Sequence, residues 1–212
     1  MFRALIILTS LLVVGCAVHP RRVQPPATAP IPVAGPAKPL PATGSGRYNK
    51  WFGEYTVLHF GSLVSPRWTK AVGMAESNLK YNAKSGVGAL GLMQFMPQTW
   101  SSVAPEPYKS LGPLDPESAI WVGCRYLRWN WNRLPVLNND ERKAFVNASY
   151  NSGLGNIFKA RAKCQTPCDK DVWSDNVEKT LVTAPQFQSE TKSYVIRIRK
   201  FERQLLFAGE FL

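Results

Sequence analysis

Histidine is scarce in this 212-residue sequence, which contains only His19 and His59. A Ser-His-Asp or Cys-His catalytic site needs a well-placed histidine as its general base. His19 stands in a proline-rich segment, and His59 is isolated within an apolar helical pattern. Catalysis of that kind is therefore not expected. A structural zinc site would also need further ligands at suitable spacing, so the sequence predicts neither a metal nor any other cofactor.

Acidic residues are few, with 14 Asp and Glu against 26 Lys and Arg, which gives a formal net charge of +12. Such an excess favours an anionic partner, which could be nucleic acid, acidic membrane lipid or an anionic cell-wall polymer. The charge alone does not distinguish these three.

Long hydrophobic runs are also lacking, since the apolar run at residues 4–14 is too short to span a bilayer as a helix. We expect residues 1–15 to be a lipoprotein signal peptide. The sequence "VVGC" at residues 13–16 resembles a lipobox, in which the cysteine becomes the lipidated N-terminus after cleavage. Ala17 after Cys16 is typical of sorting to the outer membrane, so we expect an anchor on its periplasmic face, in the cell envelope. An ordinary signal peptide with unmodified Cys16 is the alternative.

Only four cysteines are present, and two of them, Cys164 and Cys168, lie close together in "KCQTPCDK". A short spacer that contains proline can bring the two thiols together, and export permits oxidation. We therefore expect a disulfide between them. Cys124 shares one helical face with apolar residues and is expected to be a buried free thiol.

Alternating strand patterns are absent, and the globular part of the chain shows helical periodicity almost throughout. Residues 16–46 form a predicted Pro-rich tether, because the stretch 19–43 holds eight of the 17 prolines and no aromatic residue. Residues 47–212 form the predicted domain, mainly α with a very small or absent β region. Helices are expected at about 51–63, 66–78, 115–133, 138–152, 154–163 and 188–207.

Glu76 lies near the end of the second predicted helix, which Ser65 caps and Pro66 opens. The residue falls beside the apolar face that includes Val72, at the edge of the core. A desolvated carboxyl group can stay protonated near neutral pH and act as a general acid. From periodicity alone, a glutamate that merely caps the helix or pairs with a lysine is the better-supported alternative.

Four motifs, one of which contains Glu76, favour the general acid over the glutamate that merely caps the helix or pairs with a lysine. They are "AESN" at residues 75–78, "KSGVGALGLMQFMPQTW" at 84–100, "ASYNSG" at 148–153 and "ETKSYV" at 190–195. In this order they resemble the catalytic domain of the soluble lytic transglycosylase family, over about residues 48–207. The resemblance implies a lysozyme-like fold in which Glu76 faces a sugar-binding cleft.

The resemblance also implies roles for individual residues. Glu76 would protonate the oxygen between N-acetylmuramic acid and N-acetylglucosamine, and its carboxylate would then activate the muramic C6 hydroxyl, which attacks C1 to form a 1,6-anhydro sugar. The substrate supplies its own nucleophile, so no second acid is expected beside Glu76. The cleft-lining positions implied are Ser85, Met93, Gln94, Tyr150, Asn151 and Tyr194.

More specific roles follow for some of these positions. Gln94 and Asn151 are suited to hydrogen-bonding N-acetyl and hydroxyl groups, Tyr150 to orienting the Glu76 carboxyl, and Met93 to forming an apolar floor. Tyr194 is equally well explained as a core aromatic residue.

The predicted function is that of an exported, lipid-anchored lytic transglycosylase whose partners are peptidoglycan strands and, through Cys16, a membrane. Nucleic acid is not an expected partner. Two alternatives remain: a muramidase of the goose-type lysozyme kind, which lets water attack, and a cell-wall-binding lipoprotein that has lost catalysis.

Overall fold

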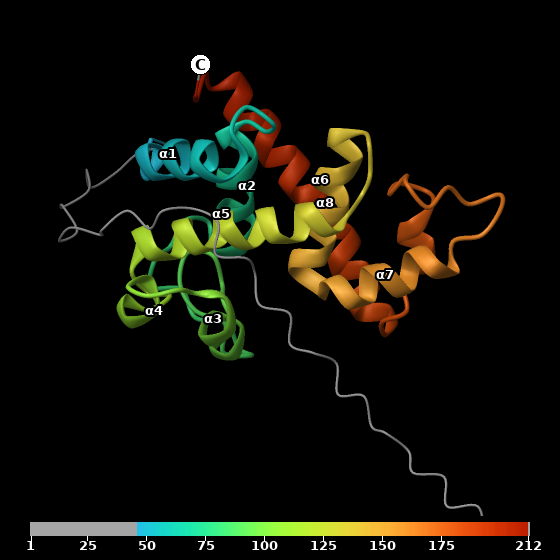
Figure 1. Ribbon diagram of the computed structural model, residues 1–212, viewed down its shortest axis with the longest axis horizontal. Helices are drawn as coiled ribbons and strands as arrows, with labels where there is room; N and C mark the ends of the chain where they lie inside the picture. Colours follow the sequence, from blue (N-terminus) through green and yellow to red (C-terminus); the bar gives the residue numbers. More distant parts are fainter. Residues whose placement is uncertain (1–45, 212) are drawn as a thin grey trace, which may run out of the picture.

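The computed structural model describes residues 46–211, and the predictions for the signal peptide, for Cys16 and for the tether up to residue 45 lie outside this range. The chain forms the helices shown in Figure 1. In order they are α1 (Asn49–Phe60), α2 (Pro66–Ser77), α3 (Pro97–Val103), α4 (Tyr108–Leu111), α5 (Pro116–Arg133), α6 (Asn139–Ser152), α7 (Leu154–Lys163), the 3-10 helix η1 (Val177–Thr180) and α8 (Pro185–Phe207).

The mainly α prediction is confirmed. Within residues 46–211, β structure is confined to two isolated bridges, which join Leu90 to Lys84 and to Phe95. Helix starts follow capping signals: the Asp115 side chain accepts from the Ser118 N–H at 2.8 Å at the start of α5.

Some elements differ from expectation. α8 begins at Pro185, three residues before the predicted start. The short helices α3, α4 and η1 were not predicted. With four to seven residues each, they are too short to show an amphipathic repeat.

The core is rich in aromatic side chains, and Trp68, Trp121 and Trp173 are almost completely buried. α5 runs through the middle of the molecule, and α8 crosses it diagonally in Figure 1. α8 packs along α2 and α6. The indole N–H of Trp68 donates to Oδ1 of Asn147 at 3.0 Å, which joins α2 to α6 inside the core. The packing of α8 against α2 and α6 holds α2 and α8 side by side.

Buried polar contacts also tie the C-terminus to the domain. The ammonium group of Lys70, on α2, forms an ion pair with Glu210, and both side chains are less than a tenth exposed. The ammonium group also donates to Oδ1 of Asn49 at 2.6 Å. The end of the chain is thereby fixed against the same helix that carries Glu76.

The cysteines of the described region fall into two kinds. Cys164 and Cys168 are joined by a disulfide with a Cα–Cα distance of 5.3 Å, just after α7. Cys124 is free and buried.

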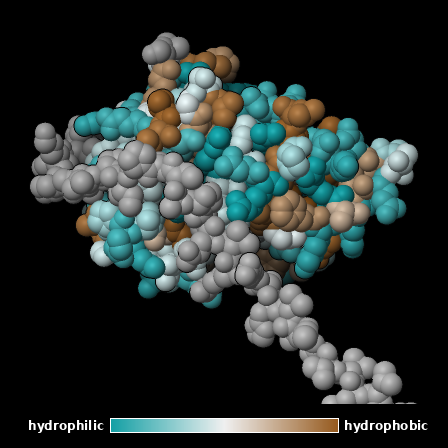
Figure 2. All heavy atoms as spheres, in the orientation of Figure 1, coloured by the Kyte–Doolittle hydropathy of each residue, from teal (hydrophilic) through white to brown (hydrophobic). Residues whose placement is uncertain are grey.

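None of the helices in residues 46–211 combines the length and the hydrophobicity that a bilayer-spanning segment requires. Figure 2 shows a face dominated by hydrophilic residues, with hydrophobic residues in scattered groups. One such group lies at the end of the molecule where Figure 1 places the C-terminal end of α8.

Candidate active site

Glu76 lies in the last turn of α2, which ends at Ser77. Asn78 terminates the helix in the left-handed conformation, with φ of 53°, and its N–H bonds back to the carbonyls of Gly73 and Met74. The Glu76 side chain is half-buried, as the sequence pattern predicts. Its position at the C-terminal, partially negative end of a helix adds to the cost of ionising it.

Tyr194 is the residue that holds the carboxyl group. It lies on α8, is 2% exposed, and its hydroxyl donates to Oε1 of Glu76. The prediction that Tyr150 performs this task is wrong, because the Tyr150 hydroxyl donates to the carbonyl oxygen of Met93 at 2.8 Å. The contact to Tyr194 joins residues 118 positions apart, so it depends on the packing of α8 against α2.

Burial raises the pKa of Glu76 from 4.5 to about 7. The hydrogen bond from Tyr194 and the charge of Arg197 act in the opposite direction, while the charge of Glu190 raises the pKa further. At neutral pH the group is therefore divided between its acid and its carboxylate. A carboxyl group in this state can donate a proton in one step and accept one in the next.

The prediction that no second acid lies beside Glu76 is wrong. Glu190 precedes Tyr194 by one turn of α8, and its charge acts on Glu76. The side chain is exposed, and its Oε1 accepts from Nδ2 of Asn151 at 3.4 Å. The signal for Glu190 was present in the sequence, since it is the first residue of the "ETKSYV" motif.

Asn151 connects the end of α6 to the beginning of α8. Its Oδ1 accepts from the hydroxyl of Thr191 at 2.8 Å, and its amide nitrogen donates to Glu190. Both the oxygen and the nitrogen of the Asn151 side-chain amide thus form hydrogen bonds with residues of α8. Asn151 therefore positions Glu190, a role that the sequence did not suggest.

The Met93 side chain belongs to the core. It is fully buried and packs against Gly123, where an added Cβ would lie 2.6 Å from the Met93 methyl carbon. The expectation that Met93 forms an apolar floor open to substrate is not met, since a side chain without exposed surface has none to offer. Its carbonyl oxygen instead anchors Tyr150, whose ring packs edge-on against Tyr126.

A tight loop at residues 83–95 carries the remaining predicted positions. Ser85 is half-buried, and its hydroxyl accepts from the Ala89 N–H at 2.9 Å, which closes the loop on itself. Gly91 has φ of 76°, and a Cβ there would meet the carbonyl oxygen of Pro113 at 1.8 Å, so only glycine fits. The amide nitrogen of Gln94 donates to the Gly91 carbonyl at 2.8 Å. This contact orients the Gln94 side chain and leaves its amide oxygen as an acceptor.

Ser77 links this loop to α2. Its hydroxyl donates to the Leu92 carbonyl at 2.8 Å, so the loop is attached one residue after Glu76. The structure thus brings Tyr194 into contact with the Glu76 carboxyl group and Tyr150 close enough for the charge of Glu76 to raise its pKa. Ser85 and Gln94 lie on the attached loop. Within residues 46–211 no group of His, Cys, Asp and Glu side chains is arranged to hold a metal ion.

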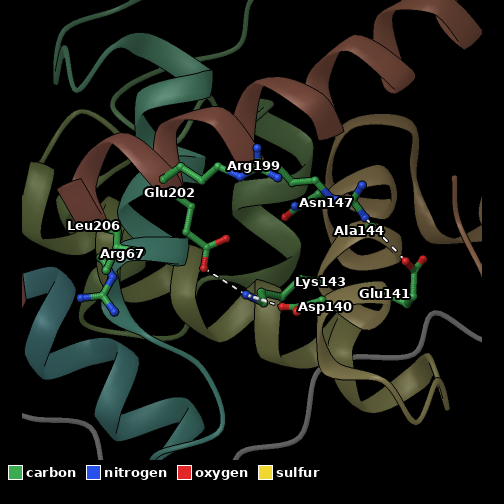
Figure 3. Close-up of a pocket in the computed structure, with 10 residues that line it drawn as sticks. Arg67, Asp140, Glu141, Lys143, Ala144, Asn147, Arg199, Glu202 and Leu206 are labelled. Carbon is green, nitrogen blue, oxygen red and sulfur yellow. Dashed lines mark hydrogen bonds and ion pairs between the residues drawn. The ribbon is translucent and has the colours of Figure 1, made fainter.

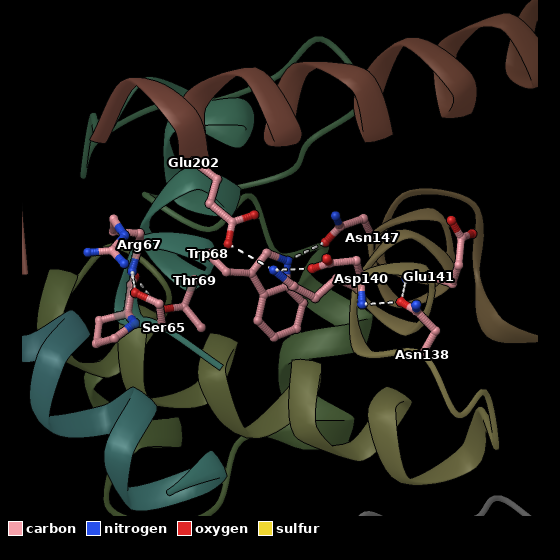
Figure 4. A network of polar contacts seen from close by, with 11 residues as sticks. Ser65, Arg67, Trp68, Thr69, Asn138, Asp140, Glu141, Asn147 and Glu202 are labelled. Atoms are coloured by element: carbon pink, nitrogen blue, oxygen red, sulfur yellow. Dashed lines mark hydrogen bonds and ion pairs between the residues drawn. The ribbon is translucent and has the colours of Figure 1, made fainter. Parts of the chain in front are cut away.

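A pocket of about 530 Å³ lies elsewhere, between the start of α2, the start of α6 and the second half of α8 (Figure 3). Its charged residues are largely paired with one another: Lys143 lies 3.0 Å from both Asp140 and Glu202. Figure 4 shows the same network above the buried Trp68. Arg67 in this pocket and Glu76 are separated by about 14 Å along α2, at 1.5 Å per residue. The pocket is therefore separate from the Glu76 cluster.

Comparison with known proteins gives consistent matches. The family described as the transglycosylase SLT domain matches residues 62–172, just over half of the chain. The membrane-bound lytic murein transglycosylase F of Vibrio campbellii is 31% identical over 154 residues, which cover 66% of this chain and 28% of that protein. The soluble lytic murein transglycosylase of Escherichia coli is 35% identical over 115 residues, which cover 52% and 17%.

Among solved structures, the 70 kDa soluble lytic transglycosylase of Escherichia coli matches with a TM-score of 0.57 and 26% identity, covering 78% of this chain and 25% of that one. This match confirms the lysozyme-like fold. The chain spans less than a third of the length of the curated relatives described above.

Proposed function

The chain belongs to the transglycosylase SLT domain family, and from this premise we propose that it is a peptidoglycan lytic transglycosylase. It would cleave the β-1,4 bond between N-acetylmuramic acid and N-acetylglucosamine and leave a 1,6-anhydro-N-acetylmuramic acid end. The observation that carries the proposal is the half-buried Glu76 carboxyl group, with its pKa raised to about 7 and Tyr194 bonded to it.

Glu76 would serve both steps of this reaction. As the acid it protonates the glycosidic oxygen while the bond from that oxygen to C1 breaks, which releases the hydroxyl of N-acetylglucosamine. As the carboxylate it then removes the proton of the muramic C6 hydroxyl while that oxygen bonds to C1. The proton lost in the first step is regained in the second, so one carboxyl group is sufficient. The Tyr194 hydroxyl keeps the carboxyl oriented and stabilises its ionised form.

The substrate contacts are assigned to the same cluster. We place the amide oxygen of Gln94 opposite an N–H or hydroxyl donor of the sugar, with Ser85 on the same loop. Asn151 and Tyr150 would act mainly by positioning Glu190 and the loop. The net charge of +12 complements a polymer rich in carboxylates.

A hydrolytic muramidase is the second candidate, and Glu190 is the observation that favours it. Glycosidases that use water or a covalent intermediate need a second carboxylate near the acid. Glu190 is exposed and its charge acts on Glu76. In the lytic reaction Glu190→Gln should only shift the pH dependence, whereas in the hydrolytic one it should remove the base that activates water.

We further propose that the protein resides in the cell envelope, anchored by a lipid on Cys16 to the periplasmic face of the outer membrane. The lipobox-like "VVGC" and Ala17 support this location. So does the name of the Vibrio campbellii relative, which describes a membrane-bound enzyme. The proline-rich residues up to 46 would let the domain reach the wall from the anchor.

Release of soluble fragments from purified peptidoglycan by Glu76→Gln and by Glu54→Gln tests the assignment. Both changes remove one carboxylate, but Glu54 lies on the exposed side of α1. Glu76→Gln should lower turnover by at least about a hundredfold, the usual scale for general acid catalysis, while its circular dichroism is unchanged. Glu54→Gln should retain full activity. Activity in folded Glu76→Gln would overturn the proposal.

A further inference from the structure

The side of α8 that faces solvent combines hydrophobic and basic residues in one line. Ile196, Lys200, Arg203 and Phe207 follow one another at intervals of four, three and four, so they share one helical face. Ile196 is 63% exposed and Phe207 86% exposed. Together with Arg199 and Gln204 they line a shallow groove of about 410 Å³, and we refer to these six residues as the outer face of α8.

The charge on the outer face of α8 is of one sign. Its lining contains Arg199, Lys200 and Arg203 and no acidic residue. Over residues 46–211, no ion pair involves Lys200 or Arg203. Arg199 donates to the hydroxyl of Ser174 at 3.1 Å and lies 3.9 Å from the carboxylate of Glu141, so it is already engaged. Two cations are therefore available beside two exposed hydrophobic side chains.

The outer face of α8 points away from the candidate catalytic acid. Tyr194, which bonds to Glu76, is buried on the inner side of the helix. Ile196 follows two residues later, about 200° around the helix axis. A flat surface that contacts the outer face would thus leave Glu76 directed away from it.

We propose that the outer face of α8 docks on an anionic phospholipid bilayer. A helix face with basic residues at its sides and Ile and Phe between them fits the boundary between headgroups and acyl chains. There the basic side chains are attracted to the anionic headgroups, and the hydrophobic side chains are buried away from water. A sugar polymer or nucleic acid would use the cations and leave Ile196 and Phe207 exposed to water. This contact is separate from any lipid on Cys16 and would orient the domain with Glu76 toward the wall.

A fluorescent label on the outer face tests the docking directly. Full-length chains with Cys16→Ser carry an environment-sensitive nitrobenzoxadiazole on Gln204→Cys or, as the control position, on Val57→Cys, which is exposed on α1. Vesicles contain phosphatidylcholine alone or equal parts of phosphatidylcholine and phosphatidylglycerol. Residues 1–45 are present in both labelled chains, so a response at Gln204 without one at Val57 reports contact through the outer face of α8.

We expect the label at Gln204 to rise in intensity by about twofold or more and to shift to the blue with the anionic vesicles only, an effect that high salt weakens. The label at Val57 should not respond. Each basic residue contributes about fivefold to the affinity for an anionic surface, so Lys200→Glu with Arg203→Glu, which removes two cations and adds two anions, should weaken vesicle binding by at least about 25-fold.

The matched control is Lys159→Glu with Lys163→Glu, which makes the same change in net charge on exposed positions of α7. This variant should bind nearly as well as the parent chain. No response at Gln204, an equal response with phosphatidylcholine alone, equal losses in both double variants, or a response to purified peptidoglycan in place of vesicles would each overturn the proposal.

Discussion

Replacing Glu76 with glutamine should stabilise the domain at pH values above about 4.5, and the stabilisation should be complete above about pH 7. The folded protein binds the Glu76 proton with a pKa of about 7, because burial disfavours the carboxylate, against 4.5 for the ordinary value. Between these two pH values the folded chain retains a proton that the unfolded chain has released. The free energy of unfolding therefore falls as pH rises through this window, and the loss is complete above about pH 7.

The size of the effect follows from the same two values. At 1.36 kcal/mol per pKa unit, the difference between 4.5 and about 7 corresponds to about 3 kcal/mol. Because the Glu76 residue is only half-buried, this is an upper figure. Glutamine cannot ionise, so Glu76→Gln avoids the loss while its amide oxygen can still accept from Tyr194.

Thermal unfolding at pH 4 and at pH 8 measures the difference. At about 2–4 °C per kcal/mol for a domain of this size, Glu76→Gln should melt up to about 6–12 °C above the parent chain at pH 8, and close to it at pH 4. Glu54→Gln, on the surface, should show no such dependence. An advantage for Glu76→Gln of the same size at both pH values would refute the reasoning that burial raises the pKa.

Three further outcomes are expected. Tyr194→Phe removes a hydrogen bond that lowers the pKa of Glu76. The apparent pKa of Glu76 in the pH-activity profile should therefore rise by about one unit. An unchanged profile would show that the contact is not made in solution. Metabolic labelling with an alkyne fatty acid should mark the parent chain and not Cys16→Ser, and label on the variant would exclude Cys16 as the acylated residue. Cys164→Ala opens a short disulfide loop and should lower the free energy of unfolding by about 2 kcal/mol in urea titration, and a stability equal to that of the parent would indicate that the bond does not form.

The long helices could be predicted because their signals are local. Ser65, Asp115 and Asn138 each cap the helix that follows, as their positions before an apolar repeat suggest. Glu76 could be placed at the edge of the core for the same reason. The start of α8 was missed because Pro185 carries the signal alone, without a side-chain cap.

The partners of Glu76 could not be predicted, because they depend on packing between distant segments. Tyr194 and Tyr150 are both tyrosines on helices near the acid, and only the packing of α8 on α2 decides which hydroxyl reaches it. Met93 stands beside Gln94 in the motif, yet one side chain turns into the core against Gly123 while the other stays at the surface of the loop. Adjacent positions in a tight loop carry no periodicity from which burial could be inferred.

The central claim, that Glu76 directs the C6 hydroxyl of the substrate rather than water to C1, is tested most directly by weighing the products. Purified peptidoglycan is digested to completion with the full-length protein, and the released muropeptides are analysed by mass spectrometry before and after borohydride reduction. Fragments ending in 1,6-anhydro-N-acetylmuramic acid, lighter by one water than a hydrolytic product and resistant to reduction, are the predicted result. Fragments with reducing ends would contradict it and would make water the nucleophile, with Glu190 as the base to examine.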